Sequence, residues 1–150
     1  METKKINFAQ YQKFELVNFQ LLMGLIGLYF IFLPGRKISY PFRDSRLIYI
    51  GMSEKKTNSI GKRLTDHVNG VSGNRGLTSY NQMDGLYFTY FNFDMYKDHW
   101  SGKVEDLENY FIVDFVDKFG VYPICNNKSS DIGFNQIVNV KFEINWNYFD

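Results

Sequence analysis

The chain has 150 residues, which is the length of a single domain with a substantial core. Its 15 Phe and 11 Tyr residues predict that aromatic rings fill much of that core. The single cysteine, Cys125, excludes an internal disulfide bond and is typical of a reducing, intracellular setting. We expect its thiol to be a small buried hydrophobic group rather than a nucleophile.

The sequence gives no sign of a membrane segment. The longest apolar run, residues 21–33, contains two glycines and is shorter than the roughly 20 residues that a membrane-spanning helix needs. The first residues lack the apolar stretch and the cleavage site of a secretory signal. We therefore expect a cytoplasmic protein without a membrane partner.

The net charge of +1 hides an uneven distribution. Residues 36–75 contain nine Lys or Arg and three Asp or Glu, whereas residues 84–117 contain eight acidic residues and two lysines. This asymmetry favours one face that binds a polyanion and an acidic face behind it. Two ordinary solvated surfaces would give the same pattern, so the charges alone do not decide between them.

The first half of the chain predicts two strands and two helices. Apolar residues at helical spacing predict an N-terminal helical extension over residues 1–24: Phe8, Tyr11, Phe14 and Val17. Residues 25–33 and 46–51 are rich in β-branched and aromatic side chains and predict strands, joined by a loop or hairpin at 36–44 that contains Pro41. A helix is predicted to begin at Asn58 or Ser59 and to end near Gly70.

The second half begins with residues 71–82, whose Gly, Ser and Asn content predicts a loop. A third strand is predicted at 86–91, and a long helix, capped by Ser101, ends at Phe119. Residues 121–127 form an extended segment. Residues 138–148 alternate strictly between apolar and polar side chains, which predicts a long amphipathic strand. That strand must pair either with the sheet of its own domain or with another chain.

Several polar side chains in these elements suit a phosphate site. Tyr29 and Tyr49 each lie in a predicted strand beside a glycine, and Arg63 and His67 are four residues apart, so they share one face of the predicted helix. Glu108 falls on the apolar stripe of the long helix. A carboxylate there is costly unless a metal ion or a cationic side chain pairs with it.

This set of residues resembles the GIY-YIG nucleases. Gly27-Leu28-Tyr29 and Tyr49-Ile50-Gly51 match the two half-motifs of that family, and the other matching residues follow in the family's order: Arg63 and His67 on a helix, Glu108 on a later helix, and Asn126 in a loop behind Pro123, with Asn127 as the alternative. The match covers roughly residues 27–126. His67 is closer to restriction and homing members than to the excision-repair branch, which usually has Tyr at this position.

The resemblance implies an α/β (α+β) fold in which a small three-stranded central sheet is flanked by helices. It implies one domain over residues 1–150, with a core at about 25–127 between the N-terminal helical extension and a C-terminal strand extension at 128–150. The minimal domain of the family has no counterpart to that last strand. A homodimer in which residues 138–148 of two chains pair is one way to give this strand a hydrogen-bonding partner.

The implied activity is a metal-dependent endonuclease that hydrolyses phosphodiester bonds in DNA. Glu108 would bind Mg²⁺ or Mn²⁺, for which oxygen ligands are suited, and Arg63 would clamp a phosphate oxygen. Tyr29 is the first candidate for the general base, with Tyr49 positioning water or sharing the role. His67 would accept or orient the tyrosine proton, and Asn126 would fix the substrate or its own loop.

Basic residues around these positions are the candidate DNA contacts: Arg36, Arg43, Lys55, Lys56, Lys62 and Arg75. A second interpretation remains open, in which the domain binds nucleic acid or assembles through its C-terminal strand, and either lacks turnover or needs a partner protein. Metal-dependent cleavage would separate the two.

Overall fold

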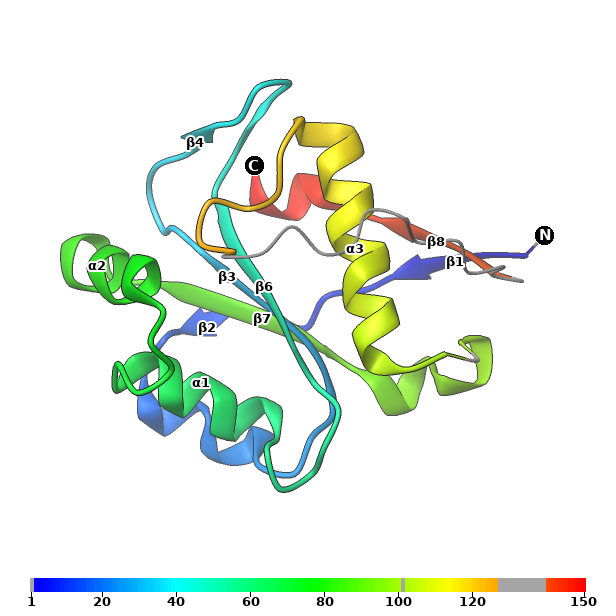
Figure 1. The fold of residues 1–150 in the computed structure, drawn as a ribbon, viewed down its shortest axis with the longest axis horizontal. Helices are drawn as coiled ribbons and strands as arrows, with labels where there is room; N and C mark the ends of the chain where they lie inside the picture. Colours follow the sequence, from blue (N-terminus) through cyan, green and yellow to red (C-terminus); the bar gives the residue numbers. More distant parts are fainter. Residues whose placement is uncertain (1, 101, 127–139) are drawn as a thin grey trace.

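A computed structural model describes residues 2–100, 102–126 and 140–150, and its centre is a mixed arrangement of sheet and helices (Figure 1). The central sheet is antiparallel and has the strand order β2-β7-β3-β6. The three predicted strands are present as β3 (Gly27–Phe32), β6 (Leu47–Ser53) and β7 (Tyr87–Asn92). A fourth strand of two residues, β2 (Gln12–Lys13), extends the predicted three-stranded sheet.

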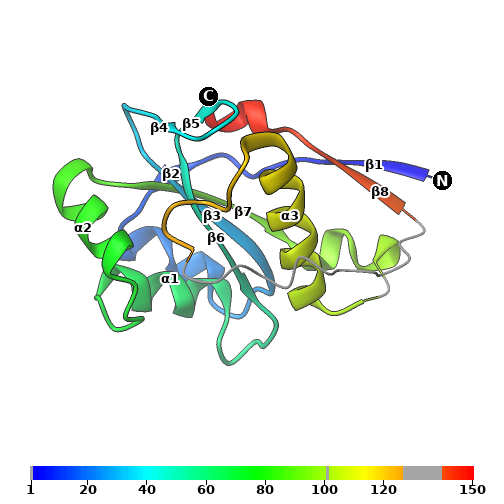
Figure 2. The ribbon, with the colours of Figure 1, turned by 45° about the horizontal axis from the view of Figure 1, so that its top comes forward.

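Strand β3 lies in the middle of the sheet and is buried on both faces. Its side chains alternate between two hydrophobic clusters, because successive residues of a strand point to opposite sides. Leu28 and Phe30 join the cluster that contains α3 (Val104–Phe119). Tyr29 joins the cluster that contains α1 (Ile60–Val68) and α2 (Arg75–Asp84), so helices cover both faces of the sheet (Figures 1 and 2).

Two of the helices were predicted, and their caps explain where they begin and end. The hydroxyl of Ser59 accepts a hydrogen bond from the backbone N–H of Lys62 and caps α1. Helix α3 begins later than predicted, with Lys103 at the N-cap, while Ser101 lies outside the described residues. It ends at Gly120, whose φ of 95° is in the left-handed region that favours glycine.

The loop predicted at 71–82 is wrong over most of its length, because α2 begins at Arg75. Asn74 supplies the N-cap: its side-chain oxygen accepts a hydrogen bond from the backbone N–H of Leu77 at 3.1 Å. Leu77 is buried in the cluster with Tyr29. A single cap and one anchored leucine therefore form a helix in a segment of low helix propensity.

The predicted N-terminal helix over residues 1–24 is also wrong. The segment forms strand β1 (Glu2–Ile6), strand β2 and two short 3₁₀ turns, η1 (Leu16–Asn18) and η2 (Gln20–Leu22). Phe8 packs against Phe30 on one side of the sheet, whereas Phe14 packs in the other cluster. Aromatic residues that serve both faces of a sheet cannot lie on one stripe of a helix.

The amphipathic C-terminal strand is present as β8 (Val140–Ile144), and a 3₁₀ turn, η5 (Trp146–Phe149), replaces its predicted end. Residues 138 and 139 lie outside the described range. Strand β8 pairs in parallel with β1, and these two strands form a sheet of their own. The backbone N–H of Phe142 also donates a hydrogen bond to the Tyr110 hydroxyl on α3. The predicted strand therefore finds a pairing partner within its own chain, although not in the central sheet.

The remaining elements are short. The predicted hairpin around Pro41 is formed by β4 (Ile38–Ser39) and β5 (Asp44–Ser45), and the connection before α3 contains η3 (Phe93–Met95) and η4 (Lys97–His99). Cys125 is buried against Gly76, and burial raises the pKa of its thiol to about 12, in keeping with the predicted inert role. Within the described residues, every helix is too short or too polar to cross a bilayer.

Candidate functional site

The two half-motifs lie side by side in the sheet. Tyr29 on β3 is the cross-strand partner of Gly51 on β6. A Cβ atom at residue 51 would overlap the Tyr29 ring, whose Cε2 atom would be only 2.6 Å away. Because Gly51 has no side chain, the Tyr29 phenol can lie over the neighbouring strand β6, on the face of the sheet that α1 covers.

Helix α1 brings two of the predicted side chains to this phenol. The Arg63 Nε–H donates a hydrogen bond to the Tyr29 hydroxyl oxygen at 3.3 Å, and His67 Nε2 lies 2.9 Å from the same oxygen. The spacing of four residues puts both on one helix face, as predicted. The phenol of Tyr29 is thus enclosed, and its exposed fraction is 0%.

Tyr49 on β6 completes the cluster and differs from Tyr29 in exposure. Its ring centroid lies 6.0 Å from that of Tyr29 and 5.2 Å from that of His67, and it is only partly buried. Burial raises the pKa of Tyr29 well above its ordinary value. Burial also raises the pKa of Tyr49, and the Glu108 charge adds to this, while the Arg63 charge and hydrogen bonds with Tyr29 and Arg63 oppose it.

His67 is held in an uncharged state. The pKa of its imidazole is lowered to about 4, first by burial and then by the Arg63 charge, while the Asp66 charge opposes the shift. Its second nitrogen, Nδ1, lies 2.7 Å from the hydroxyl oxygen of Ser72. Ser72 belongs to the loop between α1 and α2, and the sequence offered no motif that singled it out.

Glu108 on α3 faces the same cluster from the other side of β6. Its carboxylate interacts electrostatically with Arg63, Tyr29 and Tyr49. The pKa of this carboxyl is raised to about 7, chiefly by burial; the Arg63 charge opposes the rise, and the charges of Glu105 and Glu54 contribute to it. Among the described residues, no hydrogen bond or salt bridge reaches the Glu108 carboxylate, so the more distant Arg63 charge offsets only part of the cost of burying it.

A divalent ion fits this carboxylate as part of a sparse site. Within the described residues, no group of three or more His, Cys, Asp or Glu could hold a metal ion by itself. Mg²⁺ commonly binds through one or two carboxylates and completes its shell with water and substrate phosphate oxygens. One partly buried carboxylate in the same cluster as the Arg63 guanidinium suits that kind of site.

Asn126 is beside the cluster, but its side chain holds the backbone of β6. Its Oδ1 accepts a hydrogen bond from the Ile50 N–H at 3.1 Å, and its Nδ2 donates one to the Ile50 carbonyl at 2.9 Å. Both the oxygen and the nitrogen of the Asn126 side chain therefore bind the backbone of Ile50, which lies between Tyr49 and Gly51 in the sequence. Of the two predicted roles, this geometry supports fixing the loop; Asn127, the alternative, lies outside the described residues.

The predicted DNA contacts fall into two groups. Arg36 forms a salt bridge with Asp84, and Arg43 forms one with Asp150, so both are engaged at the far end of the sheet. Lys62 pairs with Asp66 along α1. Three side chains are exposed and form no salt bridge among the described residues: Lys55, Lys56 and Arg75.

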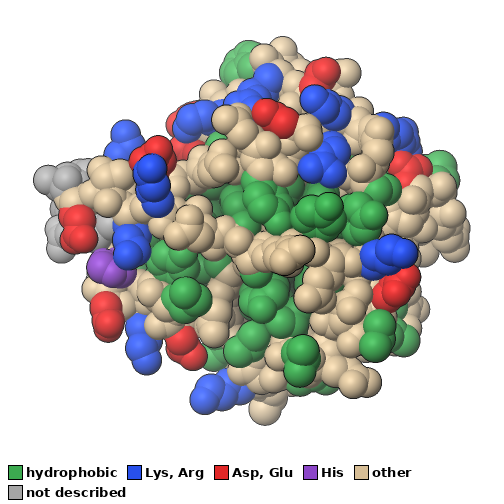
Figure 3. Space-filling model, turned by 180° about the vertical axis from the view of Figure 1, so that it is seen from behind, with side chains coloured by type: hydrophobic (Ala, Val, Ile, Leu, Met, Phe, Trp, Pro, Cys, Tyr) green, Lys and Arg blue, Asp and Glu red, His purple; other side chains and the backbone are tan. Residues whose placement is uncertain are grey.

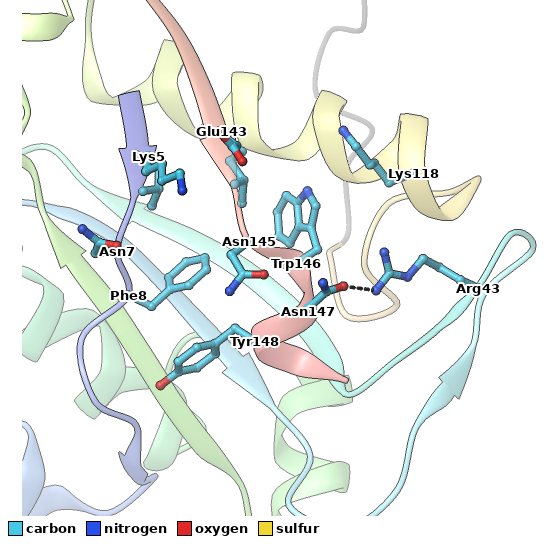
Figure 4. Close-up of a pocket in the computed structure, with 12 residues that line it drawn as sticks. Lys5, Asn7, Phe8, Arg43, Lys118, Glu143, Asn145, Trp146, Asn147 and Tyr148 are labelled. Carbon is cyan, nitrogen blue, oxygen red and sulfur yellow. Dashed lines mark hydrogen bonds between the residues drawn. The ribbon is translucent and has the colours of Figure 1, made fainter. Parts of the chain in front are cut away.

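Two other surfaces differ from this cluster. On the face turned away in Figure 1, basic and acidic side chains are interspersed around a hydrophobic centre (Figure 3). Among its described side chains, that face therefore has no large patch of positive or of negative charge alone. A hollow of about 570 Å³ lies between β1, β8 and the end of α3, and Phe8, Trp146 and Tyr148 line it (Figure 4). Two of its lining cations, Arg43 and Lys118, pair with carboxylates, whereas Lys5 forms no salt bridge among the described residues.

Comparisons with protein-family models, with curated proteins and with solved structures found no match. Interpretation of the site therefore depends on its own residues and on the motif resemblance.

Proposed function

We propose that the protein is a metal-dependent endonuclease of the GIY-YIG type that hydrolyses phosphodiester bonds in DNA. One observation carries this proposal: Arg63 and Glu108 are opposite charges in one partly buried cluster, yet they form no salt bridge with each other. A guanidinium and a carboxylate that remain unpaired at such a site are available for an anion and a cation. A phosphate group and a divalent metal ion are the pair that suits them.

The general base is assigned to Tyr49, with Tyr29 behind it. Tyr49 is partly exposed and interacts with Glu108, whereas Tyr29 is fully buried and its hydroxyl is enclosed by Arg63 and His67. A water molecule beside the substrate therefore meets Tyr49 first. This reverses the order suggested from the sequence, in which Tyr29 came first.

Arg63 binds and orients the phosphate. Its Nε–H is fixed by Tyr29, and the planar fork of a guanidinium offers further N–H donors to a phosphate oxygen. Glu108 would hold Mg²⁺ or Mn²⁺, and such an ion would supply positive charge to the phosphate and to the leaving oxygen. His67, being uncharged, accepts a proton from the Tyr29 hydroxyl or orients it.

Cleavage of supercoiled plasmid tests this function. The purified protein is incubated with the plasmid in Mg²⁺, in Mn²⁺ or in EDTA, and nicked and linear forms are counted on a gel. We expect nicking with either metal, none in EDTA, and none with Glu108→Gln. Glu105→Gln, one turn earlier on α3, is the matched control and should cleave like the wild type.

Two results would contradict the proposal. Cleavage that persists in EDTA and in Glu108→Gln would exclude the metal site at Glu108. Tight binding of DNA without cleavage in any metal would favour the binding module instead. The strand that motivated a homodimer pairs with β1 within the chain, and the backbone N–H of Phe142 donates a hydrogen bond to the Tyr110 hydroxyl.

A further inference from the structure

Ser72 is joined to the catalytic cluster through His67. His67 Nε2 lies 2.9 Å from the Tyr29 oxygen, and its Nδ1 lies 2.7 Å from the Ser72 oxygen. Tyr29 and His67 are buried, whereas Ser72 is exposed to solvent. The imidazole therefore bridges an enclosed phenol and a hydroxyl that water can reach.

The loop that carries Ser72 is held in place by its own hydrogen bonds. The backbone N–H of Ser72 donates to the Asp66 carbonyl in the last turn of α1. The Ser72 hydroxyl oxygen accepts a hydrogen bond from the Asn74 N–H at 3.3 Å, and Asn74 caps α2. Gly70 and Gly73 have φ values of 74° and 79° and make the two bends on either side of Ser72.

A neutral imidazole at His67 can satisfy its two neighbours in two ways. With the proton on Nδ1, the Tyr29 hydroxyl donates to the bare Nε2, and the Ser72 oxygen accepts from Nδ1–H. With the proton on Nε2, that N–H donates to the Tyr29 oxygen, and the Ser72 hydroxyl donates to Nδ1. Only the first arrangement lets Nε2 receive the Tyr29 proton.

We propose that Ser72 is a positioning residue that holds His67 as the Nδ1–H tautomer and forms the outlet for the proton taken up by the tyrosine pair. This inference depends on the proposed nuclease function for its catalytic consequence. As Tyr49 takes a proton from the attacking water, its own hydroxyl proton passes to the Tyr29 oxygen, the Tyr29 O–H bond breaks, and an Nε2–H bond forms. The Nδ1–H bond breaks in the same event, Ser72 gains that proton, and its own proton passes to bulk water.

The surroundings of His67 explain why an outlet is needed. The charged or titratable groups that face it are Arg63 and Asp66 from α1, Tyr29 from β3 and Tyr49 from β6. Burial and the Arg63 charge both disfavour an imidazolium here. When Nε2 gains a proton, Nδ1 must therefore release one so that the ring stays neutral, and the exposed hydroxyl of Ser72 gives that proton a way out.

The first test reads the tautomer directly and needs no cleavage. In ¹⁵N-labelled protein at pH 7, long-range ¹H–¹⁵N correlations distinguish a protonated ring nitrogen from a bare one. We expect a single Nδ1–H tautomer for His67 in the wild type and a mixture in Ser72→Ala. A wild-type Nε2–H tautomer, or one tautomer unchanged in Ser72→Ala, would overturn the proposal.

The second test measures turnover on DNA at saturating substrate. Ser72→Ala should lower kcat by about 10-fold with little change in KM, since loss of a general acid–base route costs more than this and water partly replaces the hydroxyl. Ser72→Thr, which keeps the hydroxyl, should restore most of the rate, and a small diffusible base such as imidazole should raise the rate of Ser72→Ala alone. Ser79→Ala, on the exposed face of α2, is the matched control.

The two tests separate this inference from the nuclease proposal. A protein that cleaves no DNA but shows a Ser72-dependent tautomer keeps Ser72 as a positioning residue and loses the nuclease function. A protein that cleaves DNA while Ser72→Ala keeps both the wild-type tautomer and a kcat within twofold of wild type overturns the role of Ser72 and keeps the nuclease.

Discussion

Tyr29 reaches Arg63 and His67 because Gly51, its partner on the neighbouring strand, has no side chain. Tyr29 belongs to the first half-motif and Gly51 to the second, and the position of the Tyr29 ring depends on the absence of a side chain at residue 51. A larger residue at 51 would push the phenol away from Arg63 and His67, so the second glycine is a geometric condition for the position of the first tyrosine.

Gly51→Ala should therefore destabilise the fold and disturb the cluster. The new methyl group would overlap a fully buried ring, and overpacking of this kind costs about 1–3 kcal/mol. Urea denaturation gives the free energy of unfolding, and a Gly51→Ala, Tyr29→Ala double mutant should lose less than the sum of the single mutants. Gly35→Ala, which has open space around its Cβ, should be neutral.

Glu108→Gln should stabilise the metal-free protein at alkaline pH while abolishing cleavage. The pKa of Glu108 is raised from 4.5 to about 7, so the folded state holds this proton more tightly than the unfolded chain. The stability gained from the neutral acid is present below pH 4.5 and is lost as the pH rises through about 7. The variant, which never ionises, should be more stable by about 2–3 kcal/mol at pH 8 and equal at pH 4.

Unfolding curves at the two pH values, recorded in EDTA, check this expectation. Glu105→Gln is exposed on the same helix and should show no such difference. Addition of Mg²⁺ or Mn²⁺ at pH 8 should stabilise the wild type alone and narrow the gap. An equal response of Glu108→Gln to the metal would place the ion elsewhere.

Arg63→Lys should lower kcat by about 100-fold, because a lysine keeps the charge but loses the planar fork that contacts Tyr29 and, in the proposed function, binds the phosphate. Steady-state cleavage of a labelled duplex measures the change. Arg36→Lys is the matched control: its side chain pairs with Asp84 and should be replaceable without loss of rate. Similar losses in both variants would point to general electrostatics instead of a specific clamp.

Asn126→Ala should cost about 1–3 kcal/mol of stability, since it leaves the N–H and the carbonyl of Ile50 without their amide partner. Thermal unfolding measures this change, and cleavage should fall because Tyr49 adjoins the released backbone. Asn145→Ala, whose exposed amide has no hydrogen bond among the described residues, is the control. A stable but inactive Asn126→Ala would instead assign the amide to the substrate.

Lys55 and Lys56 should carry the non-specific part of DNA binding, because both are exposed in the loop before α1 and form no salt bridge among the described residues. In the double alanine variant, the slope of log K against log salt should fall by about 2. Fluorescence anisotropy over a salt series measures this slope. Lys97→Ala, in the acidic half of the chain, should leave it unchanged.

The parts of the fold that sequence could predict have strong periodicity. Strands β3, β6 and β7 and helices α1 and α3 bury regular apolar patterns, and their predicted bounds were close. Helix α2 was missed because its identity depends on one cap, Asn74, and one anchored residue, Leu77, in a segment that resembles a loop. The N-terminal strands were missed because their aromatic residues divide between two faces of the sheet.

The residues of the candidate site also differ in whether the sequence could place them. Arg63 and His67 could be placed together from helix geometry, and Tyr29 and Tyr49 from the motif resemblance. Ser72 could not, because its contact with His67 depends on two glycine bends in the loop between α1 and α2. The sequence left two roles open for Asn126, fixing the substrate or fixing its own loop. The hydrogen bonds of its side-chain amide with the backbone of Ile50 support the second role.

Strand β6 lies at the edge of the central sheet, and the edge of a sheet invites addition of a strand from another molecule. The segment at Cys125 and Asn126 closes this edge: the Cys125 N–H donates to the Ile48 carbonyl, and the Asn126 amide takes both backbone groups of Ile50. The same three hydrogen bonds that steady Tyr49 thus shield the sheet from edge-to-edge aggregation, so variants that loosen this segment are expected to precipitate more readily as well as to work less well.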